Sequence, residues 1–319
     1  MPVFRQTKRY WTAAVALAAL LVFCNSAGAG EATHRQLTPV HAVVLGIVEG
    51  VTEYLPISST GHLLITRDAL GLGSNGPSAD SAAALETAAM NAYIVCIQFG
   101  AILAILFVCF HRFKTIFNGV FYGDQAGRRL LAHLILAFLP AAAVGLLLAD
   151  AIKTYLFGAF PVIAGWFIGG VVILIVSFRY RREKIDLHRG RCIEDMRGST
   201  ALLIGAAQCV AMWPGVSRSL ATILGAIFLG MSMEAAVEFS FLLGAVTLTA
   251  ATAYDLVRHG GEMLAVLDLS AMALGLLFAF ISAVASVKWM IRYLNRYGLE
   301  LFGFYRIFLA VVTGFVYLF

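Results

Sequence analysis

Long apolar runs separated by short charged segments dominate the chain. Six of them lie at about residues 87–110, 130–149, 158–178, 235–256, 268–290 and 303–319. Each is long enough for a membrane-spanning helix, which needs ~20 apolar residues. Two further apolar stretches, residues 45–64 and 204–224, are interrupted by proline and by hydroxyl residues. We therefore expect an all-α polytopic membrane protein with six full spans and two interrupted segments.

Each interrupted stretch predicts two half-helices joined by a polar turn. Pro56 and Pro214 stop a helix, because the residue before a proline is pushed out of α geometry. The serines and threonines that follow are common N-caps and turn formers. A helix over residues 199–212 would rise only ~21 Å, short of the ~30 Å hydrocarbon core. We expect both stretches to be re-entrant hairpins, which are tolerated where they are buried in protein or line a cavity.

The two interrupted stretches also resemble each other. With a gap of one residue, four positions of the first match four of the second: Gly46, Glu49, Pro56 and Ser59 against Gly205, Gln208, Pro214 and Ser217. The first stretch adds carboxylates and a histidine, and the second adds an arginine. Together they supply acid, base, hydroxyl and cation.

The distribution of lysine and arginine predicts the topology. The segments 111–129 and 179–197 hold four and seven such residues, and Lys288, Arg292 and Arg296 form a third cluster. The segments 67–86, 150–157 and 257–267 hold one each. By the positive-inside rule the first three are cytoplasmic and the others external, with the C-terminus also external. The two halves then form an inverted-topology repeat, with repeat one over about 38–178, a cytoplasmic loop at 179–197 and repeat two over about 199–319.

Composition agrees with a membrane protein. The 319 residues are 61% hydrophobic and only 13% charged, where soluble domains carry about 25% charged residues. The net charge of +5 lies in short loops, so we expect membrane lipids and no nucleic acid as partners. The five cysteines show no metal-ligand spacing and no disulfide framework. The sequence leaves the oligomeric state open, with a homodimer among the alternatives.

Residues 1–37 have the pattern of a targeting segment. A basic start precedes an apolar core and a small-residue site at 27–29. We expect either a cleaved signal peptide or a retained N-terminal anchor. The single membrane-embedded domain then covers residues 38–319.

Glu49 and Glu53 are the first candidates for chemistry. Four residues apart on a helix, their carboxylates lie on one face. Two such charges away from bulk water must share a proton, meet a cation or bind a metal, because ionisable groups at membrane depth are costly. A divalent cation between these glutamates and a phosphate would neutralise both, and the alternative is that one glutamate acts as general base.

The two predicted turns also make an anion site. Half-helix N-termini present unpaired N–H groups, and Arg218 adds a charged planar fork suited to phosphate. The other candidate phosphate-binding positions are Ser58, Thr60, Gly215, Ser217, Ser219 and Thr222. The alternative is that Arg218 only pairs with a glutamate and joins the two halves.

Ser59 and His62 are the candidate reactive groups. Ser59 is a nucleophile or a cap, and His62 protonates a leaving phosphate, accepts a proton from Ser59 or attacks phosphorus itself. Residue types alone do not distinguish these roles. Gln208 and Glu238 are polar positions in apolar runs, and we expect them to support the site from outside it.

The motifs resemble those of a known family. The ExxxE pair of Glu49 and Glu53, the PISSTGH motif at 56–62 and the PGVSRSxxT motif at 214–222 are similar to the bacitracin-resistance (BacA) family of undecaprenyl-diphosphate phosphatases. The resemblance runs from about residue 38 to the C-terminus. Leu220 stands where the family usually has glycine. Arg306 matches a family position, and the alternative is that it only anchors the last helix.

The resemblance implies an integral membrane enzyme that converts undecaprenyl diphosphate to undecaprenyl phosphate, the carrier lipid of peptidoglycan synthesis. It implies a divalent metal, Mg²⁺ or Ca²⁺, and active residues that match Glu49, Glu53, Ser59, His62 and Arg218. It also implies the bacterial inner membrane, where we expect the site to open to the external face. The alternative is a polyprenyl-phosphate transporter or flippase of similar inverted-repeat architecture.

Overall fold

The structure is a computed structural model that describes residues 37–72, 81–156, 158–183, 189–266 and 269–318. These residues form eleven α-helices, and their only β pairing is one isolated bridge between Arg191 and Met231. The expected all-α class is therefore confirmed. The targeting segment predicted over 1–37 lies, except for its last residue, outside the described residues.

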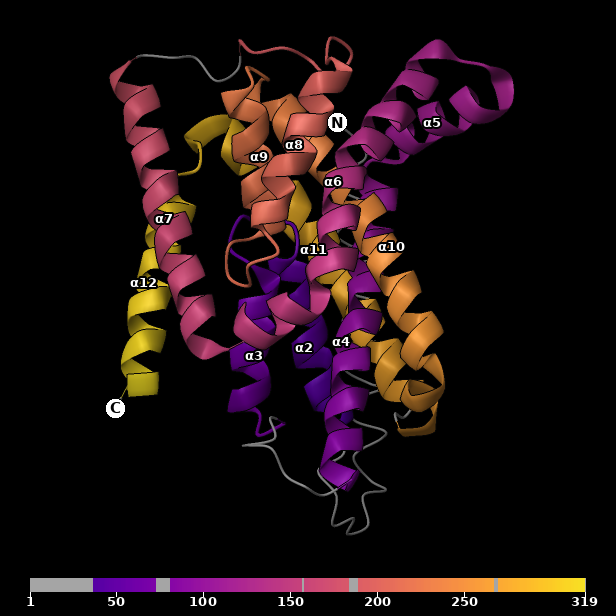
Figure 1. The fold of residues 1–319 in the computed structure, drawn as a ribbon, viewed down its shortest axis with the longest axis vertical. Helices are drawn as coiled ribbons and strands as arrows, with labels where there is room; N and C mark the ends of the chain where they lie inside the picture. The colour runs from indigo at the N-terminus through magenta and orange to yellow at the C-terminus, as the bar shows by residue number, and fades with distance from the viewer. Residues whose placement is uncertain (1–36, 73–80, 157, 184–188, 267–268, 319) are drawn as a thin grey trace, which may run out of the picture.

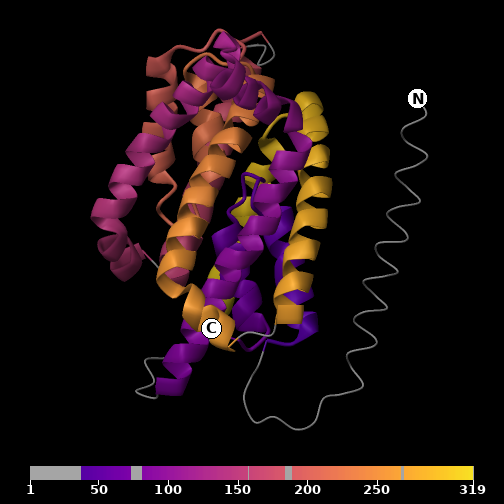
Figure 2. The same cartoon turned by 90° about the vertical axis from the view of Figure 1, so that its right-hand side faces the viewer.

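Five of the described helices are long and apolar enough to cross a membrane. They are α6 (Gln125–Leu156), α7 (Ala159–Arg182), α10 (Met233–Val266), α11 (Leu269–Tyr297) and α12 (Glu300–Leu318). All five coincide with predicted spans. α4, α10 and α11 lie side by side in the bundle (Figure 2).

The sixth predicted span is bent. α4 (Ser81–Val108) is followed at once by α5 (Phe110–Tyr122), and the two apolar parts meet at 81°. The prediction of a loop over 111–129 is therefore wrong for most of its length. α5 packs against the core through the partly buried Phe113 and Ile116, while Phe117 and Phe121 stay exposed.

The two interrupted stretches form two pairs of short helices, as predicted. The first hairpin is α2 (Pro39–Thr52) and α3 (Ser59–Ala69), and the second is α8 (Gly198–Val210) and α9 (Arg218–Phe228). With 14 residues, α2 rises ~21 Å, so even the longest of the four is too short to cross a bilayer. The hairpins enter the bundle from opposite ends, and their turns meet in its middle (Figure 1).

Small residues let the hairpins pack closely on the long helices. α2 lies against α11, where a methyl group at Gly46 would overlap the backbone of Gly275. α8 lies against α6, where a methyl group at Gly205 would overlap the backbone of Ala137. These close approaches hold the two turns at a fixed depth in the bundle.

Candidate active site

Each hairpin turn ends in a serine with a strained backbone. Ser58 (φ 70°) precedes α3 and Ser217 (φ 79°) precedes α9, and these are the non-glycine residues with positive φ in the described part of the chain. Such angles are unfavourable for residues with a Cβ and cluster at functional sites. The shared geometry marks the two turns as equivalent.

The structure corrects the alignment of the two hairpins. Ser58, not Ser59, is the counterpart of Ser217. With this pairing the same 159 positions separate Gly46 from Gly205, Glu49 from Gln208 and Ser58 from Ser217, so these residues align without a gap. The two prolines, Pro56 and Pro214, are then one position out of register. Ser59 is then the counterpart of Arg218, and the first residue of each second half-helix carries a reactive or charged side chain.

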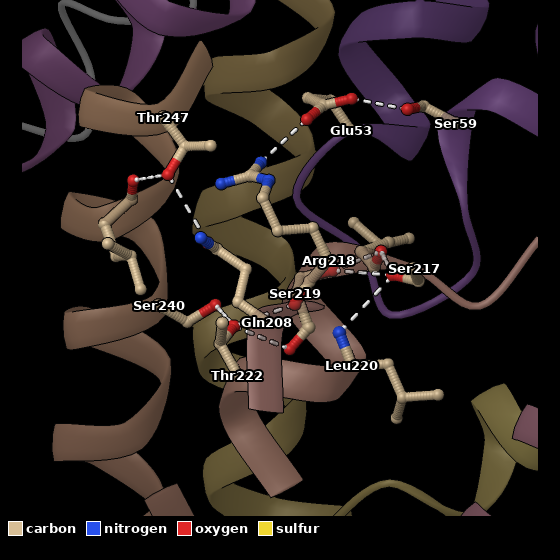
Figure 3. Close-up of polar contacts among 12 residues, drawn as sticks. Glu53, Ser59, Gln208, Ser217, Arg218, Ser219, Leu220, Thr222, Ser240 and Thr247 are labelled. Atoms are coloured by element: carbon tan, nitrogen blue, oxygen red, sulfur yellow. Dashed lines mark hydrogen bonds and ion pairs between the residues drawn. The ribbon is translucent and has the colours of Figure 1, made fainter. Parts of the chain in front are cut away.

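Glu53 joins the two turns (Figure 3). Its Oε1 accepts a hydrogen bond from Arg218 Nη2 at 2.7 Å, and its Oε2 accepts one from the hydroxyl of Ser59. Glu53 is buried, and the Arg218 side chain is 14% exposed. The carboxylate of Glu53, the hydroxyl of Ser59 and the guanidinium of Arg218 therefore meet at one point. Glu53 and Arg218 come from different hairpins and are 165 residues apart in sequence.

Glu49 lies one helical turn before Glu53 and has no exposed surface. Neither of its carboxylate oxygens has a hydrogen-bond partner in the described structure, and the charges of Glu53 and Arg218 both act on it. An ionised carboxylate without a partner is very costly to bury. Glu49 must therefore be protonated or be completed by a cation.

Arg218 is packed against the bundle on two sides. Its guanidinium lies over the ring of Tyr54, with 5.7 Å from Cζ to the ring centroid. On another side it lies against Gly244 of α10, where an added methyl group would overlap it. The Tyr54 hydroxyl is itself buried without a hydrogen-bond partner in the described structure. Arg218, which binds Glu53, is thus held in place by Tyr54 in the turn between α2 and α3 and by Gly244 in α10.

His62 lies in α3, and both of its ring nitrogens are engaged. Nδ1 is 2.7 Å from the carbonyl oxygen of Ser58, and Nε2 is 2.8 Å from the hydroxyl of Tyr305 in α12. The ring also makes an edge contact with Trp166 at 5.3 Å between centroids. These contacts come from the turn, from α12 and from α7, and Ser59 is not among them.

The serines of the second turn connect it to the first. The hydroxyls of Ser217 and Ser219 both donate to the carbonyl oxygen of Leu55, at 3.4 and 2.8 Å. The Ser217 hydroxyl also accepts from the backbone N–H of Leu220 and so caps α9. Thr222 bonds the carbonyl oxygen of Arg218 and the hydroxyl of Ser240 in α10. These side chains hold the two turns together in the described structure (Figure 3).

Arg306 of α12 holds both turns from the other side, and its role exceeds the helix anchor suggested by the sequence. It has no exposed surface and donates five hydrogen bonds to backbone carbonyls. Its acceptors are the carbonyl oxygens of Pro56 in the first turn, Gly215 and Val216 in the second, and Gly165 and Trp166 in α7. An arginine within an apolar span is the sequence signal for such a role.

The other predicted positions lie at the edge of the site or away from it. Thr60 is exposed, and Gly215 adopts φ +96°, which favours glycine. Gln208 is buried and accepts a weak hydrogen bond from Thr247 at 3.4 Å. Glu238 pairs with Arg112 of α5 through two bonds of 2.8 and 2.9 Å, so it joins α10 to α5 instead of supporting the site.

Known proteins resemble this chain over most of its length. Residues 42–312 match the family described as bacitracin resistance protein BacA. The chain is similar to an undecaprenyl-diphosphatase of Sorangium cellulosum, with 43% identity over 274 residues, 85% of this chain and 84% of the relative. It is also similar to undecaprenyl-diphosphatase 2 of Rhodospirillum rubrum, with 40% identity over 278 residues, 86% of this chain and 93% of the relative. An undecaprenyl-diphosphatase of Nitrosomonas europaea is 40% identical over 272 residues, 85% of this chain and 92% of the relative.

Proposed function

The chain belongs to the bacitracin resistance protein BacA family, and we propose from this premise and from the site how it acts as an undecaprenyl-diphosphatase. It is a multi-pass membrane hydrolase. It cleaves undecaprenyl diphosphate to undecaprenyl phosphate and inorganic phosphate, and so recycles the carrier lipid and gives bacitracin resistance. The observation that carries this proposal is the meeting of Glu53, Ser59 and Arg218 between the two hairpin turns.

The architecture is an inverted-topology repeat, with α4 as the sixth span and the two hairpins re-entrant. The packing supports this: α2 lies on α11 as α8 lies on α6, while α4 packs on α10 and α7 on α12. A twofold axis in the membrane plane would exchange α2 with α8, α4 with α10, α6 with α11 and α7 with α12. The contact of α2 with α11 then becomes the contact of α8 with α6, and the pairs α4–α10 and α7–α12 each map onto themselves. Sites in such folds lie at the midplane between the repeats.

The hairpin of α8 and α9 enters from the cytoplasmic side, and the hairpin of α2 and α3 enters from the external side. Arg181 and Arg182 at the end of α7, and Arg296 at the end of α11, lie at the same end of the bundle as the open ends of α8 and α9 (Figure 1). This clustering supports a cytoplasmic location for that end. We favour a site that opens externally, where the diphosphate is produced during wall synthesis.

The substrate diphosphate binds between the two N-termini of α3 and α9. Unpaired N–H groups and the positive ends of two helix dipoles point toward the turns, and Arg218 contributes a fork that binds phosphate oxygens. The isoprenoid tail stays in lipid. Replacement of the Glu53–Arg218 ion pair by contacts to phosphate would free Glu53 for proton transfer.

Glu49 and Glu53 fit a divalent metal. The unpartnered, buried oxygens of Glu49 are hard ligands of the kind that Mg²⁺ and Ca²⁺ prefer. The described residues contain no group of three or more His, Cys, Asp or Glu side chains arranged around a metal, so two carboxylates would be completed by phosphate oxygens and water. When bound, the metal would neutralise the diphosphate and polarise its phosphorus.

Ser59 is the nucleophile that the geometry favours. Its hydroxyl already donates to Glu53, which accepts the proton as the serine oxygen attacks the terminal phosphorus. The bond from that phosphorus to the bridging oxygen breaks, and undecaprenyl phosphate leaves. Water then hydrolyses the phosphoserine and releases inorganic phosphate. Arg218 stabilises the charge of the transferred group, and His62, at the same half-helix, accepts the proton of the water that hydrolyses the phosphoserine.

Phosphate release by the purified protein in detergent tests the proposal. A C15 or C55 prenyl diphosphate is supplied with Mg²⁺, with Ca²⁺ or with EDTA, and Ser59→Ala, His62→Ala and Arg218→Ala are compared with wild type. Ser282→Ala is the matched control, because that hydroxyl only bonds carbonyls of its own helix. We expect metal-dependent release that each of the three site variants loses. Absence of release by folded wild type with prenyl phosphate binding intact would favour the lipid transporter.

A further inference from the structure

The hydrogen bonds of His62 define its tautomer. The Ser58 carbonyl oxygen can only accept, so Nδ1 carries the proton that makes the 2.7 Å bond. In the neutral imidazole Nε2 then holds the lone pair, and it accepts the hydroxyl proton of Tyr305 at 2.8 Å. A histidine that takes part in proton transfer must present one defined nitrogen, and here that nitrogen is Nε2.

The ring orientation is fixed from several sides. The strained backbone of Ser58 aims its carbonyl oxygen at Nδ1. The Trp166 indole, which has no exposed surface and donates to the Ile57 carbonyl oxygen at 2.9 Å, packs edge-on against the imidazole. The Tyr305 ring lies parallel to it within 5°. Among these residues, Tyr305 is the one whose hydroxyl donates to the lone pair on His62 Nε2.

We propose that Tyr305 is a positioning residue, whose hydroxyl donates to the Nε2 lone pair of His62 and holds the imidazole ring in the orientation that catalysis uses. This inference rests on the proposed function, in which His62 takes part in phosphate release. The neighbouring Arg306 holds the turn backbones from the same helix, so α12 positions both the turns and the histidine. Tyr305 acts through His62 and does not contact the reacting phosphorus.

Tyr305→Phe removes the hydroxyl and keeps the ring. We expect kcat to fall about tenfold with KM within about twofold of wild type, as for the loss of one hydrogen bond that orients a reacting group. Tyr317→Phe is the matched control. Tyr317 lies on the same helix and its hydroxyl also bonds α3, but its partner is Asp68 Oδ2 at 2.9 Å. We expect this variant to keep the wild-type kcat.

Nitrogen NMR of ¹⁵N-histidine protein in detergent reads the tautomer directly, with His62→Ala identifying the His62 signals. We expect a protonated Nδ1 and an unprotonated Nε2 in wild type, in Tyr317→Phe and in Tyr305→Phe, because the Ser58 carbonyl oxygen still accepts from Nδ1. The Nε2 signal should shift in Tyr305→Phe alone, because its lone pair loses the hydrogen bond from the Tyr305 hydroxyl. An unchanged kcat in Tyr305→Phe, an equal loss of kcat in both tyrosine variants, or an unchanged His62 spectrum in Tyr305→Phe would overturn the inference. Full activity of His62→Ala would instead refute the proposed role of His62.

Discussion

Replacement of Arg306 by lysine tests whether this side chain holds the two turns together. The guanidinium donates five hydrogen bonds, whereas an ammonium group has three N–H donors. At least two carbonyl oxygens must therefore lose their donor in Arg306→Lys. Three of the five acceptors, those of Pro56, Gly215 and Val216, lie in turns outside the helical hydrogen-bond ladders.

The cost can be estimated from these contacts. A hydrogen bond to a charged group contributes about 1.5–3 kcal/mol, so the loss of two lowers the free energy of unfolding by about 3–6 kcal/mol. The site is fully buried and water cannot replace the lost donors easily. Phosphate release should fall as well, because the turns carry Ser59 and Arg218.

Equilibrium unfolding in mixed micelles of a mild detergent and SDS, followed by tryptophan fluorescence, measures this loss. Trp166 and Trp213 contact the turn regions and report on them. The control is Arg179→Lys, since Arg179 is 73% exposed and makes only an i,i+4 ion pair with Glu183. If Arg306→Lys unfolded at the same SDS fraction as wild type and the control, the five bonds would not stabilise the turns.

Three further predictions follow from the site. Gly244→Ala places a methyl group against the guanidinium of Arg218, and we expect phosphate release to fall at least about tenfold. Glu49→Gln keeps the shape of a buried side chain but removes a metal ligand, and the Mg²⁺ concentration for half-maximal activity should rise about tenfold or more. Glu238→Gln weakens the contacts with Arg112 and His111 of α5, so SDS unfolding should shift while kcat stays within about twofold.

Each of these has an outcome that contradicts it. Gly145→Ala is the control for the methyl insertion, because its added methyl group would meet only the end of the Met212 side chain. If Gly244→Ala and Gly145→Ala had equal activity, a methyl group at position 244 would not disturb Arg218. An unchanged Mg²⁺ dependence in Glu49→Gln would exclude that carboxylate as a ligand, and a large loss of kcat in Glu238→Gln would return Glu238 to the site.

Much of the helical framework was predictable because it depends on local pattern. Runs of apolar residues coincide with α6, α7, α10, α11 and α12, although α6, α10 and α11 extend seven to ten residues beyond the predicted ends at 149, 256 and 290. The breaks at Pro56 and Pro214 follow from the geometry of proline. Pairing of Glu53 with Arg218 was one of the expected alternatives, since two buried opposite charges in one membrane domain have few other partners.

Other features depend on tertiary contacts that residue types do not reveal. The correct alignment of the two turns could be found only from backbone angles, because Ser58 and Ser59 are both serines and only Ser58 adopts positive φ. α5 was missed because its charged residues suggest a loop, although the partly buried Phe113 and Ile116 pack against the core at helical spacing. The position of Arg306 in an apolar span signals a role, but the sequence does not reveal that its partners are backbone carbonyls of both turns. Nor does it reveal that Tyr305 contacts a histidine 243 residues away.

A double-mutant cycle on Glu53 and Arg218 tests the central claim most directly, since it asks whether the two hairpin turns form one catalytic site. Phosphate release from prenyl diphosphate is measured for wild type, Glu53→Gln, Arg218→Gln and the double variant, each checked by SDS unfolding. We predict that each single variant loses at least about 100-fold and that the double variant loses little more, because groups acting as a unit are not additive. Losses that multiply in the double variant would show that the two turns act independently and would contradict the account.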